Sequence, residues 1–505
     1  MLGIGVLLLC GLALAPLLGL VWFAFGPGEA VGGAVGESLS FDLGADGPAQ
    51  AQNTLALVAL VGLLSALLGT ATGWITARCS FPGRRWLRIA QLLPLASPSY
   101  LLAATWIDLG SRYGIRIHGF APTLVVLLLS TYSYVFLLST ESFSVSGRRQ
   151  LEASRSLGVG PWGSFWRVAL PMALPSIGAG VALGGMEVVN ELGAVQLLGV
   201  PTLSSGILMR WQQDGDPQGA VALALMALVI VVLLVAAERN LRGRSRCWNL
   251  GNDGDSDLRW PLARQRRWLG QLVCLLPPLV SLGVPLLWAL LSWDQIRSED
   301  SSELLALGGR SFGLALLAAF LTVAAGLVLA IAKRWLANGL IQRLSFVAGL
   351  GYAIPGAVLA LALMLIGGPL ALAPMLLLVW GYADRFLAVS KGGLDAALER
   401  IPPSVDEAAT SLGSSWLGVL QRVHLPLLRG PLLVGGLLVF VDTVKELPLT
   451  FALRPFDFDT LAVRVFQYAS DERVGAALVP ALMILALGIL AAMALIPSLD
   501  RLERN

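Results

Sequence analysis

"EASRSLGVGPWGSFWRVALP" (Glu152–Pro171) is a polar stretch in a chain dominated by apolar segments. It returns 255 residues later as "EAATSLGSSWLGVLQRVHLP" (Glu407–Pro426), with ten of the twenty positions identical. Average composition gives about one or two such matches by chance. The register continues at Val189/Val444, Glu191/Glu446 and Leu192/Leu447. The chain therefore carries an internal duplication.

The composition indicates a membrane protein. The chain has 505 residues, of which 56% are hydrophobic and 13% charged, and its mean hydropathy is +0.75. Soluble proteins carry about 25% charged residues, and a lipid-facing chain must keep charges out of its spans. The net charge of +3 is too small to suggest a nucleic-acid partner.

Apolar runs of about 20 residues can cross a bilayer as helices. We predict an all-α polytopic membrane protein with about twelve transmembrane helices in two parallel six-span repeats. No basic residue precedes the first run, so we expect an uncleaved span rather than a signal peptide. The predicted spans are residues 3–25, 54–77, 87–107, 120–140, 170–194, 218–237, 269–292, 311–332, 344–366, 369–390, 429–450 and 475–497.

The arginines predict the orientation and the division of the chain. Residues 26–53 contain no Lys or Arg, whereas residues 78–88 and 239–267 are rich in Arg. Basic loops stay in the cytoplasm, so we predict that both termini and both copies of the polar stretch are cytoplasmic. The predicted division is a first half at 1–240 (core repeat 54–240), a cytoplasmic linker at 241–267 and a second half at 268–505 (core repeat 310–498). Two equivalent loops on one side suit a partner that is itself a dimer.

Several chemistries are absent from the sequence. None of the three lysines follows a glycine, so the chain lacks the phosphate-binding loop G-x-x-x-x-G-K-[ST]. The two histidines cannot form a histidine cluster, and the four cysteines show no C-x-x-C spacing. There is also no H-E-x-x-H motif and no convincing nucleophile constellation. We therefore expect no enzyme activity and no bound cofactor, and any ATP must bind to another polypeptide.

Each copy of the polar stretch has features of a docking loop. Its first residue, Glu152 or Glu407, is expected to favour a short helix by complementing the positive end of the helix dipole. The glycine six residues later, Gly158 or Gly413, permits a turn that other residues resist. The closing proline fits the first turn of the next helix, where its missing N–H costs nothing.

These residues resemble the EAA loop of the permease subunits of ABC importers, although Ser154 replaces the usual third alanine. The resemblance implies a type I importer fold in which each loop is a coupling helix seated on an ATPase subunit dimer. It implies ATPase coupling for Glu152, Ala153, Gly158, Pro171, Glu407, Ala408, Gly413 and Pro426.

Three further stretches are similar to the fused twelve-span permeases of ferric-iron importers. They are "VPTLSSGILMRWQQDGDPQGA" (200–220), "IPPSVDEAATSLG" (401–413) and "VDTVKELPLTFALRPFDFDTLAVRVFQYASDER" (441–473). The resemblance implies a bacterial inner-membrane subunit that takes ferric iron from a periplasmic iron-binding protein. Thiamine, polyamine and sulfate permeases share this architecture, so another solute remains an alternative.

Ionisable side chains within spans usually line a pathway. The candidates for a translocation path are Glu187, Glu191, Asp384, Asp442, Lys445 and Glu446. Ferric ion prefers oxygen ligands, which carboxylates and the phenols of Tyr132, Tyr134 and Tyr382 supply. Structural pairing is the alternative, with Lys445 neutralising a nearby acid and Asp384 bound to Arg385; the sequence leaves any metal ligands undetermined. In an ion-gradient-driven carrier, Glu187, Glu191 and Glu446 would instead bind protons or sodium.

Overall fold

The computed structural model confirms the all-α class. It describes residues 2–25, 43–145, 151, 153–154, 156–244, 260–262, 264–294, 301–336, 339–349 and 351–504. Helices dominate these ranges, which also contain one short parallel pair of strands, β1 (Cys79–Ser80) and β2 (Trp260–Pro261). Within these ranges we call the part up to Arg244 the first half and the part from Arg264 the second half.

The helices account for fewer straight spans than predicted. In the described part of the chain, seven helices are long and apolar enough to cross a membrane, and two bent helix pairs raise the number to nine. The seven are Gly3–Phe25, Gly47–Arg78, Phe120–Ser144, Trp162–Asn190, Pro217–Leu241, Gln265–Leu291 and Ser302–Trp335. The chain is thus a multi-pass membrane protein, and the count of twelve stays a prediction.

Prolines and glycines interrupt three of the predicted spans. Residues 87–107 form α3 (Arg84–Ala90), the 3-10 helix η1 (Leu93–Ala96) and α4 (Ser99–Arg112), because Pro94 and Pro98 cannot donate backbone hydrogen bonds. Residues 344–366 likewise divide into α15 (Gly339–Ala348), η5 (Gly351–Ala353) and α16 (Gly356–Gly367), with Pro355 at the last break. The span at 429–450 ends at Lys445 and follows a bend of 72° before Pro431.

The order of helices repeats along the chain. Each described helix of the first half has a counterpart about 255 residues later, in the same order, whereas the strand β1 has none. The three short helices α3, η1 and α4 correspond to α15, η5 and α16. Further pairs are α2 (Gly47–Arg78) with α14 (Ser301–Trp335), α5 (Phe120–Val145) with α17 (Pro374–Glu399), α8 (Leu170–Asn190) with α20 (Leu425–Leu427) and α21 (Arg429–Lys445), α9 (Gly193–Leu197) with α22 (Pro448–Leu453), α10 (Leu203–Gln212) with α23 (Leu461–Ser470), and α11 (Pro217–Arg244) with α24 (Leu478–Arg504).

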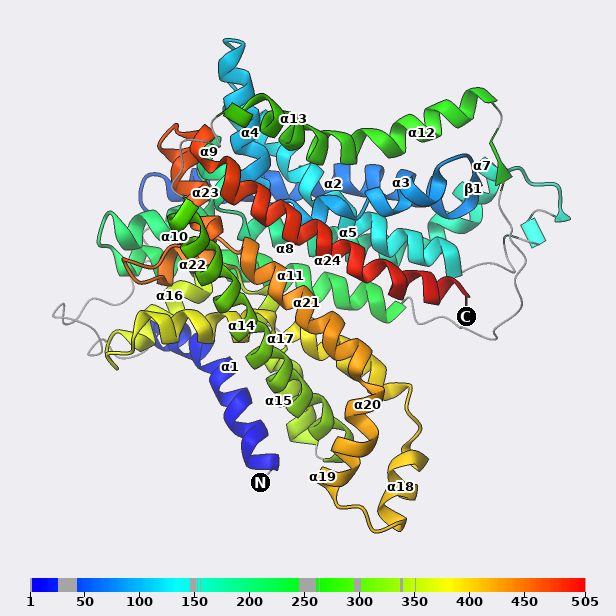
Figure 1. The fold of residues 1–505 in the computed structure, drawn as a ribbon, viewed down its shortest axis with the longest axis vertical. Coiled ribbons are helices and arrows are strands. Elements are labelled where there is room, and N and C mark those ends of the chain that lie inside the picture. The colour runs from blue at the N-terminus through cyan, green and yellow to red at the C-terminus, as the bar shows by residue number, and fades with distance from the viewer. Residues whose placement is uncertain are drawn as a thin grey trace.

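The two halves exchange their first helices. Helix α1 (Leu2–Phe25) packs against α14, α15 and α16 of the second half, whereas α12 (Arg264–Pro278) and α13 (Val284–Leu291) pack against α2, α3 and α4 of the first. Figure 1 shows α1 beside α14 and α15, and α12 with α13 along the opposite side, next to α3 and α4. The packing thus unites the two repeats in one helical body.

Two observations bear on the predicted linker at 241–267. Helix α11 continues to Arg244 and α12 begins at Arg264, so both helices reach into this stretch. Residues 245–259 lie outside the described residues, and the division into halves at 240 and 268 stays a prediction. The largest hydrophobic core crosses between the halves, with Ala224 of α11 and Leu359 of α16 both fully buried in it. A polar site lies beside this shared core.

Candidate functional site

A small polar cavity of about 80 Å³ lies between the two halves. The first half lines it from η1, α4, α5 and the end of α8, and the second half from η5, α17 and the end of α21. Of the predicted path residues, Glu187, Glu191, Asp442, Lys445 and Glu446 line the cavity. The fold therefore brings together five side chains from two segments of the sequence, one in each half.

The repeat places equivalent residues in this cavity. Glu187-Val-Val-Asn190-Glu191-Leu192 in the first half corresponds to Asp442-Thr-Val-Lys445-Glu446-Leu447 in the second. Each segment ends a long helix, after which the next residue is extended, with φ −65° and ψ 129° at Glu191 and φ −68° and ψ 124° at Glu446. Two acids at matching positions, Glu187 and Asp442, thus face one cavity from opposite halves.

Glu191 and Glu446 each cap the short helix that follows. The Glu191 carboxylate accepts hydrogen bonds from Ser99 Oγ and, at 2.9 Å, from the backbone N–H of Ala194. The Glu446 carboxylate accepts the matching bond from Leu449 N–H at 3.1 Å, and further bonds from the N–H and hydroxyl of Thr450, both at 3.2 Å. Capping satisfies helix N–H groups that have no intrahelical partner, so both acids also have a structural role.

Lys445 and Asn190 join the two halves. The Lys445 ammonium lies 2.9 Å from Asp442 Oδ1 and donates a hydrogen bond of 3.0 Å to the carbonyl of Leu95 in η1. The Tyr100 hydroxyl donates to the Lys445 carbonyl at 3.3 Å. At the equivalent position, Asn190 Oδ1 accepts a 2.6 Å hydrogen bond from the backbone N–H of Gly356 in the second half. The Lys445 and Asn190 side chains thus each form a hydrogen bond to the backbone of the opposite half.

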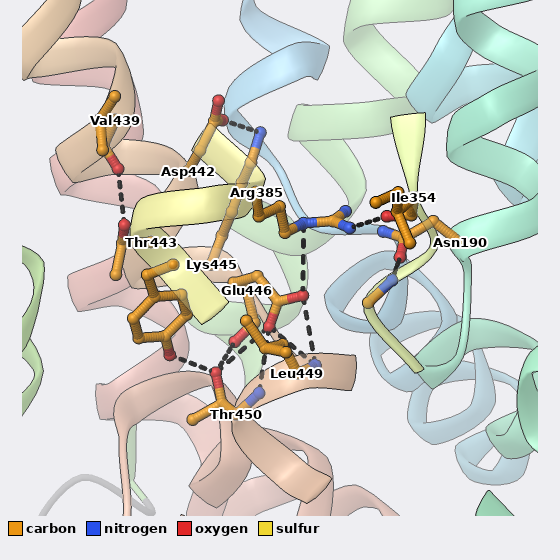
Figure 2. A network of polar contacts seen from close by, with 12 residues as sticks. Asn190, Ile354, Arg385, Val439, Asp442, Thr443, Lys445, Glu446, Leu449 and Thr450 are labelled. Carbon is orange, nitrogen blue, oxygen red and sulfur yellow. Dashed lines mark hydrogen bonds and ion pairs between the residues drawn. The ribbon is translucent and has the colours of Figure 1, made fainter. Parts of the chain in front are cut away.

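Asp384 and Arg385 do not pair with each other. Arg385 donates to the Ile354 carbonyl at 2.7 Å, and its Nε lies 3.7 Å from Glu446 Oε1 (Figure 2). Asp384 is buried, and neither of its carboxylate oxygens has a hydrogen-bond partner among the described residues. The suggested Asp384–Arg385 pair is therefore wrong: adjacent residues on a helix project in different directions. Asp384 is not among the cavity-lining residues.

The chemistry of the lining suits a hard cation. Four carboxylates and two basic side chains line the cavity, a formal balance of −2. The hydroxyls of Ser97, Ser130, Thr131, Tyr134 and Tyr352 add neutral oxygen ligands. Tyr382 is directed elsewhere and hydrogen-bonds Thr450, and Tyr132 is buried outside the lining. In this conformation the described residues contain no group of three His, Cys, Asp or Glu side chains close enough to hold a metal ion.

The two predicted docking loops have the expected glycine turns. Gly158 and Gly413 adopt positive φ values of 75° and 80°. The turns are closed by matching hydrogen bonds, from Val159 N–H to the Ser154 carbonyl at 3.0 Å and from Ser414 N–H to the Ala409 carbonyl at 3.1 Å. These bonds belong to a Schellman-type helix end. Glu152 lies outside the described residues, and the roles of the loop residues stay predictions.

One detail of these loops differs from expectation. Glu407 is the fifth residue of α18 (Pro403–Ser411), beyond the first turn where the helix dipole acts, and Asp406 lies closer to the helix start. The expected place of the prolines is confirmed, since Pro171 and Pro426 lie in the first turns of α8 and α20. A π-helical turn directly precedes each of these helices, at Phe165–Ala169 and Leu420–His424.

The second loop is anchored by charges that sequence reasoning missed. Asp406 accepts a 2.6 Å hydrogen bond from Arg334 Nε and lies 2.7 Å from His424 Nε2. The first loop has an apolar anchor at the matching place, where Trp74 packs against Phe143 and Phe165. Burial alone would raise the pKa of Asp406, but its hydrogen bonds to Arg334 and His424 hold that pKa below its ordinary value. In the sequence, the one indication of a role for Asp406 was its position directly before the predicted loop.

A multi-pass helical body with an oxygen-lined cavity between two repeated halves defines a membrane transport protein. Residues 69–246 match the family of binding-protein-dependent transport system inner membrane components, and the second half repeats the matched pattern. This part of the chain is therefore similar to the permeases of that family.

The similar proteins are transport permeases. The chain is 27% identical over 445 residues to the Fe(3+)-transport system permease protein FbpB 2 of Haemophilus influenzae, which covers 86% of each chain. It is 28% identical over 219 residues to the molybdenum transport system permease protein ModB of Escherichia coli K12, covering 38% of this chain and 94% of ModB. A probable sulfate transport permease, cysT of Nephroselmis olivacea, is 28% identical over 210 residues, or 38% of this chain and 74% of its own.

Proposed function

We propose that the chain is the membrane-spanning subunit of an ATP-binding-cassette importer for ferric iron. The observation that carries this proposal is the likeness to a ferric-iron permease over 86% of both chains, a length that must extend into both repeats. The cavity supports it, because its excess of carboxylates attracts a cation and its oxygen ligands suit a hard one. The path residues would then be Glu187, Glu191, Asp442, Lys445 and Glu446, with buried Asp384 behind them.

The partners follow from the same proposal. An ATPase dimer on the cytoplasmic side would contact the two loops, whose exposed leucines, Leu157 and Leu412, are 82% and 87% accessible and hold equivalent positions. The coupling residues would be those predicted from the loop, Glu152 and Glu407 among them. A periplasmic iron-binding protein would deliver the cargo. The chain itself would bind no cofactor and catalyse no reaction, and both termini would face the cytoplasm of a bacterial inner membrane.

An oxyanion importer is the second candidate, because molybdenum and sulfate permeases are similar to one half of the chain. The formal balance of −2 in the cavity disfavours an anion. Thiamine or another small solute is also an alternative. An ion-gradient-driven carrier is disfavoured by the two equivalent loops, since such a carrier has no ATPase to contact.

The decisive experiment is uptake into sealed vesicles that contain the chain, its ATPase and its binding protein. We expect labelled ferric iron to accumulate only with ATP and the binding protein, and not with a non-hydrolysable ATP analogue. Molybdate, sulfate and thiamine supply the matched comparisons. ATP-dependent uptake of one of these in place of iron would reassign the cargo. Uptake driven by an ion gradient without ATP would overturn the importer class.

A further inference from the structure

The Lys445 ammonium lies among carboxylates that line the cavity. It is bound to Asp442 at 2.9 Å and lies in a cavity that also contains Glu187 and Glu191. The equivalent residue of the first half, Asn190, is neutral, so the repeat does not require a charge here. The second half thus carries a positive charge, Lys445, at the position where the first half has the neutral Asn190.

The same ammonium holds the halves together. Its hydrogen bond to the Leu95 carbonyl joins α21 to η1, and the bond from the Tyr100 hydroxyl to the Lys445 carbonyl joins α21 to α4. The ammonium cannot leave Asp442 for a distant position without also breaking its bond to Leu95. Occupation of the acids by another cation is therefore linked to loosening of this contact.

Two polar groups of residues that line the cavity lack hydrogen-bond partners among the described residues. Ser97 lines the cavity and is only 7% exposed, and its hydroxyl has no hydrogen-bond partner among the described residues. Arg385 Nε is similarly buried and lacks a hydrogen bond within the described part of the chain. Buried polar groups are normally satisfied. An unsatisfied hydroxyl beside carboxylates points to a further ligand, and a cation would use its oxygen.

We propose that Lys445 is a tethered cation that occupies a hard-cation site between transport events, and that the cargo enters by displacing its ammonium from Asp442. This proposal rests on the proposed function for the nature of the cargo. An intramolecular ammonium is displaced only by a cation that gains more from the same carboxylates, and electrostatic attraction grows with charge. Because of Lys445, only a cation of sufficiently high charge binds to these carboxylates. When the ammonium leaves Asp442, its hydrogen bond to the Leu95 carbonyl breaks as well.

The first test compares Tb³⁺ with Ca²⁺, which are similar in size and differ in charge. The full-length chain is placed in discs of uncharged lipid, Tb³⁺ binding is followed by luminescence sensitised by nearby aromatic side chains, and Ca²⁺ is the competitor. Lys445→Gln removes the charge and keeps a donor for the Leu95 carbonyl. We expect the affinities for both ions to rise by the same factor, about tenfold or more, because one displacement step is removed for each ion.

The controls separate displacement from other roles. Lys445→Arg should retain weak Ca²⁺ binding, Asp442→Asn should lower Tb³⁺ binding, and Lys333→Met, which removes an ammonium paired with Asp395 and Glu399 elsewhere, should change neither. If Lys445 were a charge that stays in place, its loss would favour Tb³⁺ more than Ca²⁺, since repulsion grows with ion charge. That result, or unchanged affinities in Lys445→Gln, would overturn the proposal.

The second test observes the ammonium itself. The chain has only three lysines, so isotope-labelled methylation of their amines gives few NMR signals, and Lys445→Arg identifies the one from Lys445. We expect diamagnetic La³⁺ to shift this signal at concentrations that fill the Tb³⁺ site, while the Lys333 signal stays fixed. An unmoved Lys445 signal at saturation would contradict displacement. Neither test uses iron uptake, so a failure of the proposed transport function would be seen separately.

Discussion

Asn190 and Lys445 hold equivalent positions in the two repeats, and each makes a hydrogen bond to the backbone of the opposite half. Asn190 accepts from Gly356 N–H at 2.6 Å, and Lys445 donates to the Leu95 carbonyl at 3.0 Å. One contact is neutral and the other carries a charge. The duplication has thus preserved the position of the contact while its chemistry diverged, and the two contacts can be tested apart.

Asn190→Ala should loosen the halves without changing cation binding. The substitution leaves the Gly356 N–H without its acceptor, and an unsatisfied buried donor costs about 1–3 kcal/mol. We expect a lower thermal unfolding midpoint in lipid discs and unaltered Tb³⁺ affinity. Asn190→Asp keeps the acceptor and should be less destabilising. A wild-type midpoint in Asn190→Ala would mean that this bond contributes nothing to the interface.

Gly158→Ala and Gly413→Ala should each disturb one docking loop. A residue with a side chain at φ 75° or 80° is strained, by about 1 kcal/mol or more. We expect weaker binding of the ATPase subunit by each variant and little effect on the membrane spans. Gly160 lies in the same loop with open space around it and no positive φ, so Gly160→Ala is the matched control. Equal binding by all three variants would argue against a role for the turns.

A related change tests the loop glutamates. Glu152→Ala with Glu407→Ala should uncouple ATP hydrolysis from uptake while the membrane domain still folds, since truncating a surface charge such as that of the exposed Glu407 costs little stability. The measurement is ATPase activity stimulated by the binding protein, together with uptake. Normal values of both in the double variant would remove these glutamates from the coupling proposal.

The sequence predicted what local patterns determine. Hydropathy gave the membrane class, and the 255-residue register aligned Glu191 with Glu446, which the structure places in the lining of one cavity. It did not predict the breaks at Pro94 and Pro98, because hydropathy averages over single prolines. The partner of a helix is a tertiary property, so the exchange of α1 between the halves had no sequence signal.

The missed residues have a common cause. Asn190 is neutral and attracts no notice until the register aligns it with Lys445. The anchor of Asp406 depends on Arg334, 72 residues away, and no spacing rule connects them. The alternative pairing of Asp384 with Arg385 was wrong because residues next to each other in the sequence do not face each other on a helix.

The second docking loop should lose its anchor in acid, and the first should not. The pKa of Asp406 lies below its ordinary value of 3.8 in the folded chain, because Arg334 and His424 outweigh the effect of burial. Its contribution to stability is therefore complete above pH 3.8 and is lost as the pH falls through the lowered folded pKa. Hydrogen exchange should then increase at residues 403–411. Exchange at Phe165 and its apolar neighbours is the internal reference, and Asp406→Asn at neutral pH should reproduce the change. Equal responses of both loops to acid would contradict this difference in anchoring.

Glu446→Gln should destabilise the chain more than Glu191→Gln, although the two acids hold equivalent positions. Both amides keep an oxygen that can cap the next helix, at Leu449 N–H or Ala194 N–H. Within the described ranges, Glu446 has a buried basic neighbour, Arg385, and Glu191 has none. Removing one member of a buried ion pair costs about 3 kcal/mol.

Transport by the same variants addresses the path. If both acids attract the cation, ferric uptake at equal membrane abundance should fall further in the double variant than in either single one, because each acid supplies part of the negative charge of one cavity. Glu399→Gln, which alters a 72% exposed carboxylate that forms an ion pair with Lys333, is the control and should transport normally. The double variant could transport iron at the wild-type rate while Glu446→Gln is still less stable than Glu191→Gln. Glu191 and Glu446 would then act only as helix caps, and the cation path would follow Glu187 and Asp442.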